Sequence, residues 1–288
     1  MKIIKYFFES FFIYLFFLFI KIIGLKLSRK IFGIIFNFIG PAIRSNKKIN
    51  SNIDIVFNNI DYLKKEKIIN GMWKNYAKIF VEYMFLKKFR HNNNHMSIKG
   101  INYLEKIKTS NKPVIFVSGH FSNFELMSME LTKAGINLAA IYRPLNNIFL
   151  NPFMEKVRKK YICTHQIKKG LPGIRQSINF LKDNFSIALM VDQRLGEGKK
   201  IPFFKKDALT TTLPAQLSLK FGIDIVPVYI SRNKNDNYEM QIFKSISASD
   251  YMNNEEGIIQ LSEKINSIIE NLIPINPSQW IWTHDRWK

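Results

Sequence analysis

A histidine followed five positions later by a glutamate is the arrangement in this chain best suited to chemistry. His120 and Glu125 stand in the segment GHFSNFE, residues 119–125, directly after an apolar run at 113–117 that is typical of a buried strand. A histidine held by a carboxylate can take a proton from a hydroxyl, so the pair suggests acyl transfer. Positions i and i+5 of one helix lie roughly 140° apart. The two side chains can therefore meet only if His120 precedes a helix and Glu125 lies in its first turn.

A capping box is the alternative interpretation of the same residues. Ser122 is a plausible N-cap, and Glu125 three positions later would then bond back to the Ser122 backbone N–H without any part in chemistry. The pair alone leaves both interpretations open.

Charged residues also follow two other predicted strands. Arg143 comes directly after an apolar run at 138–142, and Asp192, Gln193 and Arg194 follow another at 187–191. Open α/β sheets bind their ligands at the carboxyl ends of the strands, so we expect these residues near His120. Arg143 could bind a phosphate or a developing oxyanion, and Asp192 could orient it.

The order of apolar segments predicts the fold. Short apolar runs alternate with stretches of helical periodicity, which indicates an α/β fold with a central mixed, mostly parallel sheet flanked by helices. The predicted strands are 113–117, 138–142, 187–191, 223–230 and an added strand at 237–244. The predicted helices are 64–89, 124–134, 149–159, 174–181, 214–221 and a closing helix at 255–272.

The amino terminus predicts a membrane-anchoring helix. Residues 3–25 are apolar except for Lys5, Glu9, Ser10 and Lys21. The length is marginal for a span, so the helix either crosses the bilayer or lies in its interface with the lysines snorkelling. A cleaved signal peptide is the rival, but no small-residue cleavage site follows, which favours a retained anchor.

A second apolar stretch at 31–39, which we expect Gly40-Pro41 to end, also predicts membrane contact. Basic residues crowd the downstream side, and the positive-inside tendency places the main body in the cytoplasm. These residues are Lys21, Lys26, Arg29, Lys30, Arg44, Lys47 and Lys48. We predict two parts, a membrane anchor at 1–42 and a catalytic domain at 43–288.

The excess of basic residues indicates which classes of partner the protein can bind. The 43 Lys and Arg against 22 Asp and Glu give a formal charge of +21, which favours an anionic membrane, an acidic carrier or another anionic partner. The aromatic residues fall at core spacing and no RNA or DNA motif is visible, so nucleic acid is not expected. The single cysteine, Cys163, excludes an internal disulfide, and its apolar surroundings indicate an inert buried thiol.

Taken together, the motifs resemble the late acyltransferases of lipid A biosynthesis, the lauroyl/myristoyl type within the lysophospholipid acyltransferase superfamily. Four segments carry the likeness in order along the chain: the HX4E segment 119–125, then Tyr142-Arg143-Pro144, then Asp192-Gln193-Arg194 followed by Pro202-Phe203-Phe204 and Thr210, and finally 277–288. Two positions depart from the family pattern. Lys205 stands where the family usually has glycine, and Phe124 replaces the more common tryptophan, so the likeness does not define the acyl length or the acceptor preference.

The resemblance implies a reaction and its participants. An acyl chain would pass from acyl carrier protein to a hydroxyl of a phosphorylated lipid A precursor at the cytoplasmic face of the inner membrane, with no cofactor and no metal. His120 would be the general base and Glu125 its partner, and Arg143 and Asp192 would match charged positions needed for catalysis or substrate binding, together with their neighbours Gln193 and Arg194. In the carboxyl-terminal segment, Trp280 and Trp282 alternate as in a strand; we interpret both as core or interfacial anchors, and His284 as structural.

Other functions remain as alternatives. The transferase could act on another glycolipid or on a glycerophospholipid, because glycerolipid acyltransferases share a similar His-x4-Asp pattern. A membrane-anchored protein that binds anionic lipid without turnover would also use the basic surface. A metal-dependent hydrolase needs three or more ligands, and His120 has no second histidine nearby in the sequence.

Overall fold

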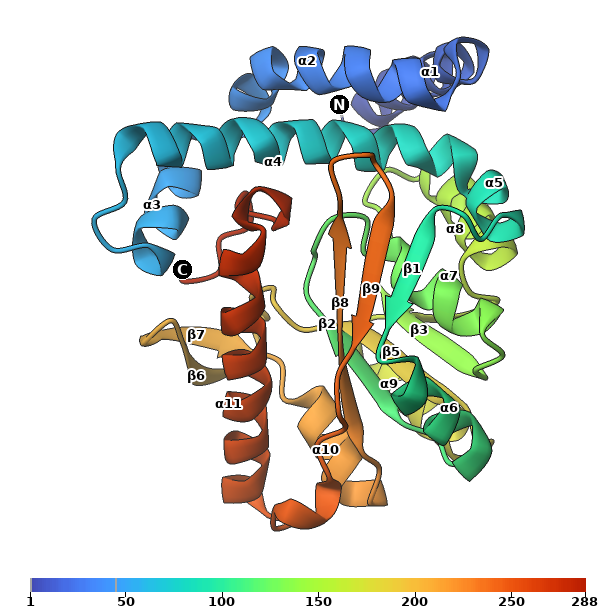
Figure 1. Ribbon diagram of the computed structural model, residues 1–288, viewed down its shortest axis with the longest axis vertical. Coiled ribbons are helices and arrows are strands. Elements are labelled where there is room, and N and C mark those ends of the chain that lie inside the picture. The colour runs from blue at the N-terminus through green and yellow to red at the C-terminus, as the bar shows by residue number, and fades with distance from the viewer. Residues whose placement is uncertain (1, 45) are drawn as a thin grey trace.

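The computed structural model describes residues 2–44 and 46–288 and confirms the predicted α/β fold class (Figure 1). A seven-stranded sheet lies at the centre, with helices on both of its faces. The strands of this sheet are β1 (Met96–Lys99), β2 (Ile115–Ser118), β3 (Leu138–Tyr142), β4 (His165–Lys168), β5 (Ser186–Met190), β8 (Ile225–Arg232) and β9 (Tyr238–Ile242). The predicted strands are present; the strand at 138–142 has its predicted bounds, and the bounds of the others differ by a few residues.

The sheet order is β1-β9-β8-β2-β5-β3-β4. All neighbouring pairs are parallel except β8 and β9, which form an antiparallel hairpin. β2 lies between β8 and β5, and β3 lies on the other side of β5. The carboxyl ends of β2, β5 and β3 therefore meet at one edge of the sheet.

Two apolar clusters fill the space on the two faces of the sheet. One contains residues of α4, α9, α10 and α11, and the other contains residues of α5, α6 and α7. The helices are α3 (Asn46–Val56), α4 (Tyr62–Glu82), α5 (Leu86–His91), α6 (Ile101–Ser110), α7 (Glu125–Lys133), α8 (Asn151–Tyr161), α9 (Leu171–Lys182), α10 (Leu213–Phe221) and α11 (Glu255–Leu272). A separate antiparallel hairpin is formed by β6 (Lys199–Phe203) and β7 (Lys206–Thr210).

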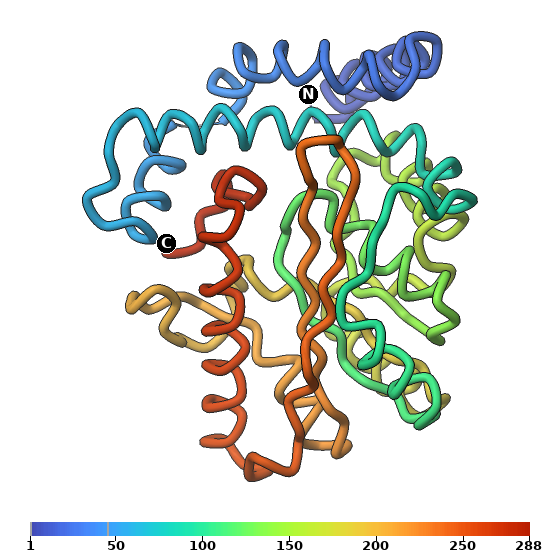
Figure 2. Tube along the Cα trace, viewed as in Figure 1, coloured from blue at the N-terminus to red at the C-terminus, as the bar shows by residue number. Residues whose placement is uncertain are grey.

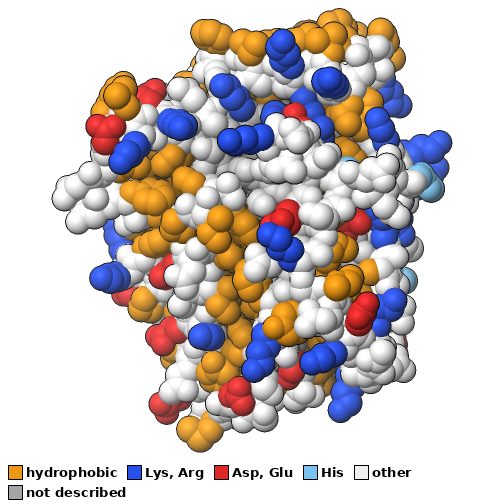
Figure 3. Space-filling model, in the orientation of Figure 1, with side chains coloured by type: hydrophobic (Ala, Val, Ile, Leu, Met, Phe, Trp, Pro, Cys, Tyr) orange, Lys and Arg blue, Asp and Glu red, His pale blue; other side chains and the backbone are white. Residues whose placement is uncertain are grey.

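The two amino-terminal helices form a layer above α4, as the trace in Figure 2 makes clear. They are α1 (Lys2–Ile23) and α2 (Leu25–Ile43). Of the helices in the described residues, α1 alone is long and apolar enough to cross a membrane by its length and composition. Figure 3 shows apolar side chains along the outer edge of this layer, with Lys and Arg side chains just below it. Phe8, Phe12, Leu18 and Phe38 are among the exposed apolar residues.

Three local predictions were wrong. Helix α2 does not end at Gly40-Pro41 but continues to Ile43, since a proline in the last turns removes only one backbone donor. The helix predicted at 64–89 is interrupted by a 3₁₀ turn at Tyr83–Phe85. Residues 280–288 form turns instead of a strand. Strand β8 already pairs with β2 on one side and β9 on the other, so this segment has no free edge there.

Candidate active site

The carboxyl ends of three adjacent strands bring the predicted site residues to one edge of the sheet. His120 follows β2, Asp192 follows β5 and Arg143 follows β3. His120 is partly buried and Asp192 is fully buried, whereas Arg143 is exposed. The strand order thus brings His120 and Asp192, which are 72 positions apart in the sequence, into contact.

Asp192 holds His120 through two hydrogen bonds. The ring nitrogen Nδ1 of His120 lies 2.7 Å from Oδ1 of Asp192, and the backbone N–H of His120 donates to Oδ2 at 2.8 Å. The indole N–H of Trp280 also donates to Oδ2, at 2.7 Å. The carboxylate thereby fixes the ring and the backbone of the histidine together.

The surroundings of Asp192 keep its carboxylate ionised. Burial acts to raise the pKa of this group, but the charge of His120, the two hydrogen bonds from His120 and the bond from Trp280 lower the pKa below its ordinary value. Gly119 leaves room for this approach, because a Cβ at that position would lie 3.1 Å from Oδ2 of Asp192 and 2.7 Å from the Phe121 ring.

The turn between His120 and α7 has a geometry that the sequence did not indicate. Ser122 has a φ of 46°, in the left-handed region, and its N–H donates to the carbonyl of Gln279 at 2.7 Å. Helix α7 begins at Glu125 and its N-cap position is Phe124, without a side-chain cap. Neither the predicted N-cap at Ser122 nor the capping box forms.

Glu125 pairs with other residues than the expected His120. Its Oε1 accepts from Nε of Arg158 at 2.9 Å and from Nη2 of Arg158 at 2.5 Å, and it also accepts from the hydroxyl of Tyr83. The carboxylate bonded to the histidine ring is that of Asp192. The predicted pair of His120 and Glu125 does not form. Glu125 still lies in the wall of the same pocket as His120.

Arg158 is held in place by Glu125 and two aromatic rings. Its guanidinium lies over the rings of Tyr83 and Tyr142, at 5.9 and 5.6 Å from their centres. Burial acts to lower the pKa of Arg158, but Glu125 outweighs it and raises the pKa, so the group stays charged. Its Nη1 is buried and has no partner among the described residues. This donor is therefore unsatisfied within the described part of the protein.

A cavity of about 370 Å³ extends inward from His120. Apolar side chains form its inner wall, among them Met127, Ala140, Ile162, Ala188 and Leu189. The amide nitrogen of Gln193 lies 3.4 Å from Nε2 of His120 at the mouth. Cavities with apolar walls and a few polar groups are typical of small-molecule sites, and this one suits an aliphatic chain.

A basic cleft of about 540 Å³ adjoins this cavity, and both share Arg143 and Gln193 in their walls. Five basic side chains line the cleft: Arg44, Lys48, Arg143, Lys169 and Arg194. The one acidic residue in the wall, Asp285, pairs with Lys48 at 3.0 Å. The excess of positive charge suits an anionic group.

Arg194 and His284 are linked at the floor of this cleft. The backbone N–H of Arg194 donates to Nε2 of His284 at 2.8 Å, and the side chain of Arg194 reaches the carbonyl of Lys288 at 3.2 Å. Burial lowers the pKa of His284 to about 4. His284 is therefore a neutral acceptor at neutral pH.

Sequence reasoning missed the roles of Arg158, Tyr83 and Trp280. Arg158 stands in the basic run KVRKK at 156–160 and looks like a solvent-facing charge. Trp280 and Trp282 are core residues as predicted, but the contact of Trp280 with Asp192 joins segments 88 positions apart. No local pattern carries that information.

Neither a reactive thiol nor a metal site is found among the described residues. Cys163 is buried, and burial raises its pKa to about 11, which fits an inert thiol. Among the residues described, no group of three or more His, Cys, Asp or Glu side chains is arranged to hold a metal ion.

Comparison with known proteins relates the whole chain to one group. The family model described as bacterial lipid A biosynthesis acyltransferase matches residues 1–288. The lipid A biosynthesis palmitoleoyltransferase of Escherichia coli (strain K12) and a lipid A biosynthesis acyltransferase of Shigella flexneri are each 27% identical over 198 residues, which is 66% of this chain. A second Shigella flexneri protein, lipid A biosynthesis acyltransferase 2, is 23% identical over 191 residues. The matched regions span 61%, 61% and 58% of the three relatives.

Proposed function

Because the chain belongs to the bacterial lipid A biosynthesis acyltransferase family, we propose that it transfers a fatty acyl group to a hydroxyl of a lipid A precursor. The proposed donor is a thioester of acyl carrier protein, and the proposed acceptor is a phosphorylated glycolipid. His120 is the general base. The relatives are named for acyl transfer in lipid A biosynthesis, which supports the reaction class.

The contact between His120 and Asp192 carries the proposal. With Nδ1 donating to Asp192 at 2.7 Å, Nε2 is the accepting nitrogen of the ring, with the Gln193 amide 3.4 Å away, and His120 lies in the wall of the apolar cavity. A neutral imidazole in this tautomer can take a proton from an alcohol, whose own pKa lies far above 7.

The reaction then proceeds in two steps. The acceptor hydroxyl attacks the thioester carbonyl as its proton passes to Nε2 of His120, which gives a tetrahedral oxyanion and an imidazolium stabilised by Asp192. The oxyanion collapses to the ester, the carbon–sulfur bond breaks, and the thiolate takes the proton back from His120. No acyl-enzyme is required.

Glu125 acts in this scheme through Arg158. The carboxylate orients the guanidinium, and the unpaired Nη1 of Arg158 can donate to the oxyanion or to a substrate phosphate. A donor fixed in advance in a site of low dielectric contributes roughly 10²- to 10³-fold in rate. Glu125 therefore belongs to the proposed catalytic site because it orients Arg158.

The basic cleft supports an anionic acceptor and an acidic carrier. Arg143 stands where the cavity and the cleft meet, and Gln193 and Arg194 line the next part of the wall. A glycolipid phosphate bound in the cleft would bring its hydroxyl toward His120, while the acyl chain occupies the apolar cavity. The surface charge would also draw an acidic carrier protein toward the site.

We place the protein at the cytoplasmic face of the inner membrane, with residues 1–42 as the anchor and 43–288 as the catalytic domain. The exposed apolar side chains of α1 and α2 support contact with lipid. On its inner side α1 contacts the body of the protein, where the hydroxyl of Ser10 donates to the side chain of Asn147 at 2.8 Å.

Acyl transfer to a lipid A precursor tests the proposal directly. Membranes containing the protein are incubated with the precursor and either acyl carrier protein thioesters or coenzyme A thioesters, and the product is weighed by mass spectrometry. We expect one added acyl group, its loss in His120→Ala, and normal activity in the control His91→Ala, whose side chain is exposed on α5. Tight binding of the precursor without any acyl product from either donor would instead support a lipid-binding protein.

A further inference from the structure

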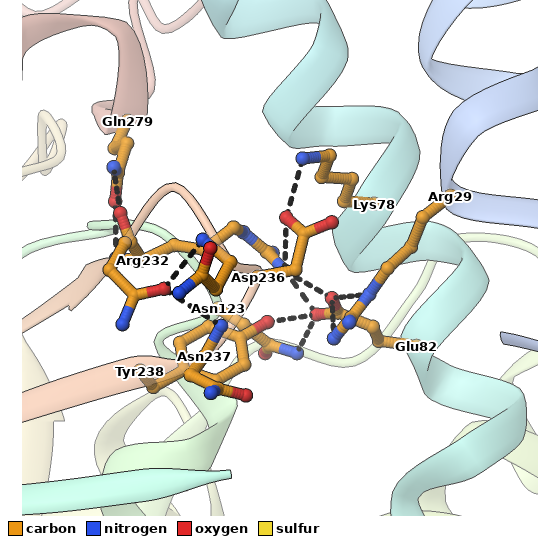
Figure 4. Close-up of polar contacts among 11 residues, drawn as sticks. Arg29, Lys78, Glu82, Asn123, Arg232, Asp236, Asn237, Tyr238 and Gln279 are labelled. Carbon is orange, nitrogen blue, oxygen red and sulfur yellow. Dashed lines mark hydrogen bonds and ion pairs between the residues drawn. The ribbon is translucent and has the colours of Figure 1, made fainter. Parts of the chain in front are cut away.

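A second buried charged cluster lies outside the proposed site, centred on Glu82 at the end of α4 (Figure 4). The Glu82 side chain is fully buried and receives donors from four residues. Nε of Arg29 donates at 2.7 Å, the amide of Asn123 at 2.7 Å and Nη2 of Arg232 at 3.2 Å, and the hydroxyl of Tyr238 completes the set.

The cluster keeps Glu82 ionised. Burial acts to raise its pKa, but Arg232 and Arg29 outweigh burial and lower the pKa to about 2. A buried carboxylate with two guanidinium partners is costly to disturb, because the loss of one partner leaves a charge without compensation. Such a network holds its members in one arrangement.

The four residues that donate to Glu82 come from four other parts of the chain. Arg29 lies on α2, Arg232 ends β8, Tyr238 begins β9, and Asn123 belongs to the turn that follows His120. The same turn has a second attachment through Gln279. This side chain bonds the backbone of Arg232 at both its N–H and its carbonyl, each at 2.8 Å, and the Gln279 carbonyl accepts from the N–H of Ser122.

Asn123 connects the cluster to the histidine. It is 2% exposed, its Nδ2 donates to Glu82, and its Oδ1 has no partner within the described residues. Its neighbour Ser122 has the unfavourable φ of 46°, which persists only when surrounding contacts impose it. The bond to Glu82 is one of these contacts.

We propose that Glu82 is a positioning residue for His120. Through Asn123 it holds the strained turn 119–124 so that the histidine ring meets Asp192, and through Arg29 it ties this turn to the membrane-facing helix α2. The inference rests on the proposed function, since it assigns Glu82 to the placement of the general base.

Asn123→Ala tests the proposal with the least damage, because it removes the link and leaves Glu82 with Arg29, Arg232 and Tyr238. We expect kcat to fall roughly 10- to 100-fold, since a base misplaced by about 1 Å loses activity on this scale, with KM for both substrates changed by less than about twofold. Asn123→Asp, which sets a second carboxylate against Glu82, should be at least as impaired.

The matched control is Asn266→Ala. Asn266 is 1% exposed on α11, and its amide donates to the carbonyl of Pro202 at 2.9 Å, away from the cavity and the cleft. Asn266→Ala likewise removes a buried amide donor, which bonds the Pro202 carbonyl and, at 3.4 Å, Oγ1 of Thr210, whereas Asn123 bonds a carboxylate. We expect a similar drop in melting temperature in both variants but a normal kcat in Asn266→Ala.

Hydrogen–deuterium exchange gives a readout that needs no activity. In Asn123→Ala, and to a smaller extent in Arg29→Ala, the amides of 119–124 should exchange faster than in the wild type, while Arg29→Lys keeps the charge and the protection. Unchanged exchange in these amides and a kcat within about twofold of the wild type in Asn123→Ala would overturn the proposal. A wild type without acyl transfer would refute the proposed function and leave the exchange test intact.

Discussion

Two carboxylates lie at the proposed site, and they bind different groups: Asp192 binds an imidazole and Glu125 binds a guanidinium. Asp192 is bonded to the ring and backbone of His120 and to the indole of Trp280. Glu125 is bonded to the guanidinium of Arg158 and the hydroxyl of Tyr83. One carboxylate therefore orients an imidazole, and the other orients a guanidinium whose positive charge is permanent.

The two carboxylates therefore have different roles in the proposed reaction. A carboxylate beside an imidazole selects its tautomer and stabilises the imidazolium that forms during proton transfer. A carboxylate beside an arginine fixes the direction of a permanent positive charge. Glu125, the glutamate of the HX4E segment, contacts Arg158 and therefore acts in the second of these two ways.

Asp192→Asn should have the largest effect. The amide can donate to Nδ1 of His120, which favours the tautomer with the proton on Nε2 and leaves no base for the hydroxyl. We expect kcat to fall by about 10²- to 10⁴-fold, measured as acyl transfer at saturating substrates. Asp183→Asn, an exposed position after α9, is the control. A nearly normal Asp192→Asn variant would contradict the role of His120 as the base.

Glu125→Gln and Arg158→Lys should come next and should resemble each other. Either change disturbs the guanidinium, and a preorganised donor of this kind is worth about 2 to 4 kcal/mol, or roughly 30- to 1,000-fold in kcat/KM. The double variant should be no worse than about the worse single variant, because the two residues act as one unit.

Comparing the two single variants tests whether Glu125 acts through Arg158. If Glu125 acts on His120 and not through the guanidinium, Arg158→Lys will be almost normal while Glu125→Gln is strongly impaired. If Glu125 has a structural role alone, both variants will lose melting temperature and keep their turnover.

Arg143→Ala should show a smaller effect with a different dependence on salt. Arg143 is exposed at the junction of the cavity and the basic cleft, so its attraction for a phosphate is screened by ions. We expect KM for the acceptor to rise roughly 3- to 10-fold at low salt, and the difference from the wild type to shrink as salt increases. A defect that persists at high salt would indicate a buried contact in the bound complex.

The sequence predicted His120 correctly as a residue at the end of a strand but suggested the wrong hydrogen-bond partner for it. Asp192 comes 72 residues after His120 in the sequence, and only the parallel pairing of β2 with β5 brings the two together. Glu125 has the spacing of a partner, but the left-handed Ser122 and the start of α7 at Glu125 place its carboxylate against Arg158. Sheet order and turn geometry are tertiary properties that spacing does not encode.

Much of the fold followed from periodicity, and the errors have physical causes. The strand at 138–142 and the helix at 255–272 have clear patterns and were predicted with their observed bounds. Strand β1 and strand β4 are short and partly polar, so they carried no signal. The alternation of Trp280 and Trp282 resembled a strand, but both pack into the core from a turn, and Trp287 stacks on Phe203 at 5.6 Å.

The smallest expected effect is on the pH dependence of stability, and it comes from His284, which lies near Asp192. His284 has a folded-state pKa near 4, against about 6.5 when unfolded, so between these values the unfolded chain binds a proton that the native protein does not. Stability should therefore fall as the pH drops from about 6.5 toward 4. The lowered pKa values of Asp192 and Glu82 place their own loss of stability below about pH 4, outside the upper part of this window.

His284→Gln isolates this contribution. The glutamine oxygen can replace Nε2 as the acceptor for the N–H of Arg194 without titrating. We expect the melting temperature of the wild type to fall by a few degrees more than that of His284→Gln between pH 7 and pH 5, since His284 is only partly buried and the surrounding water reduces the effect. If both proteins lose the same melting temperature between pH 7 and pH 5, His284 binds a proton as readily in the native protein as in the unfolded chain, which would contradict a lowered pKa for His284.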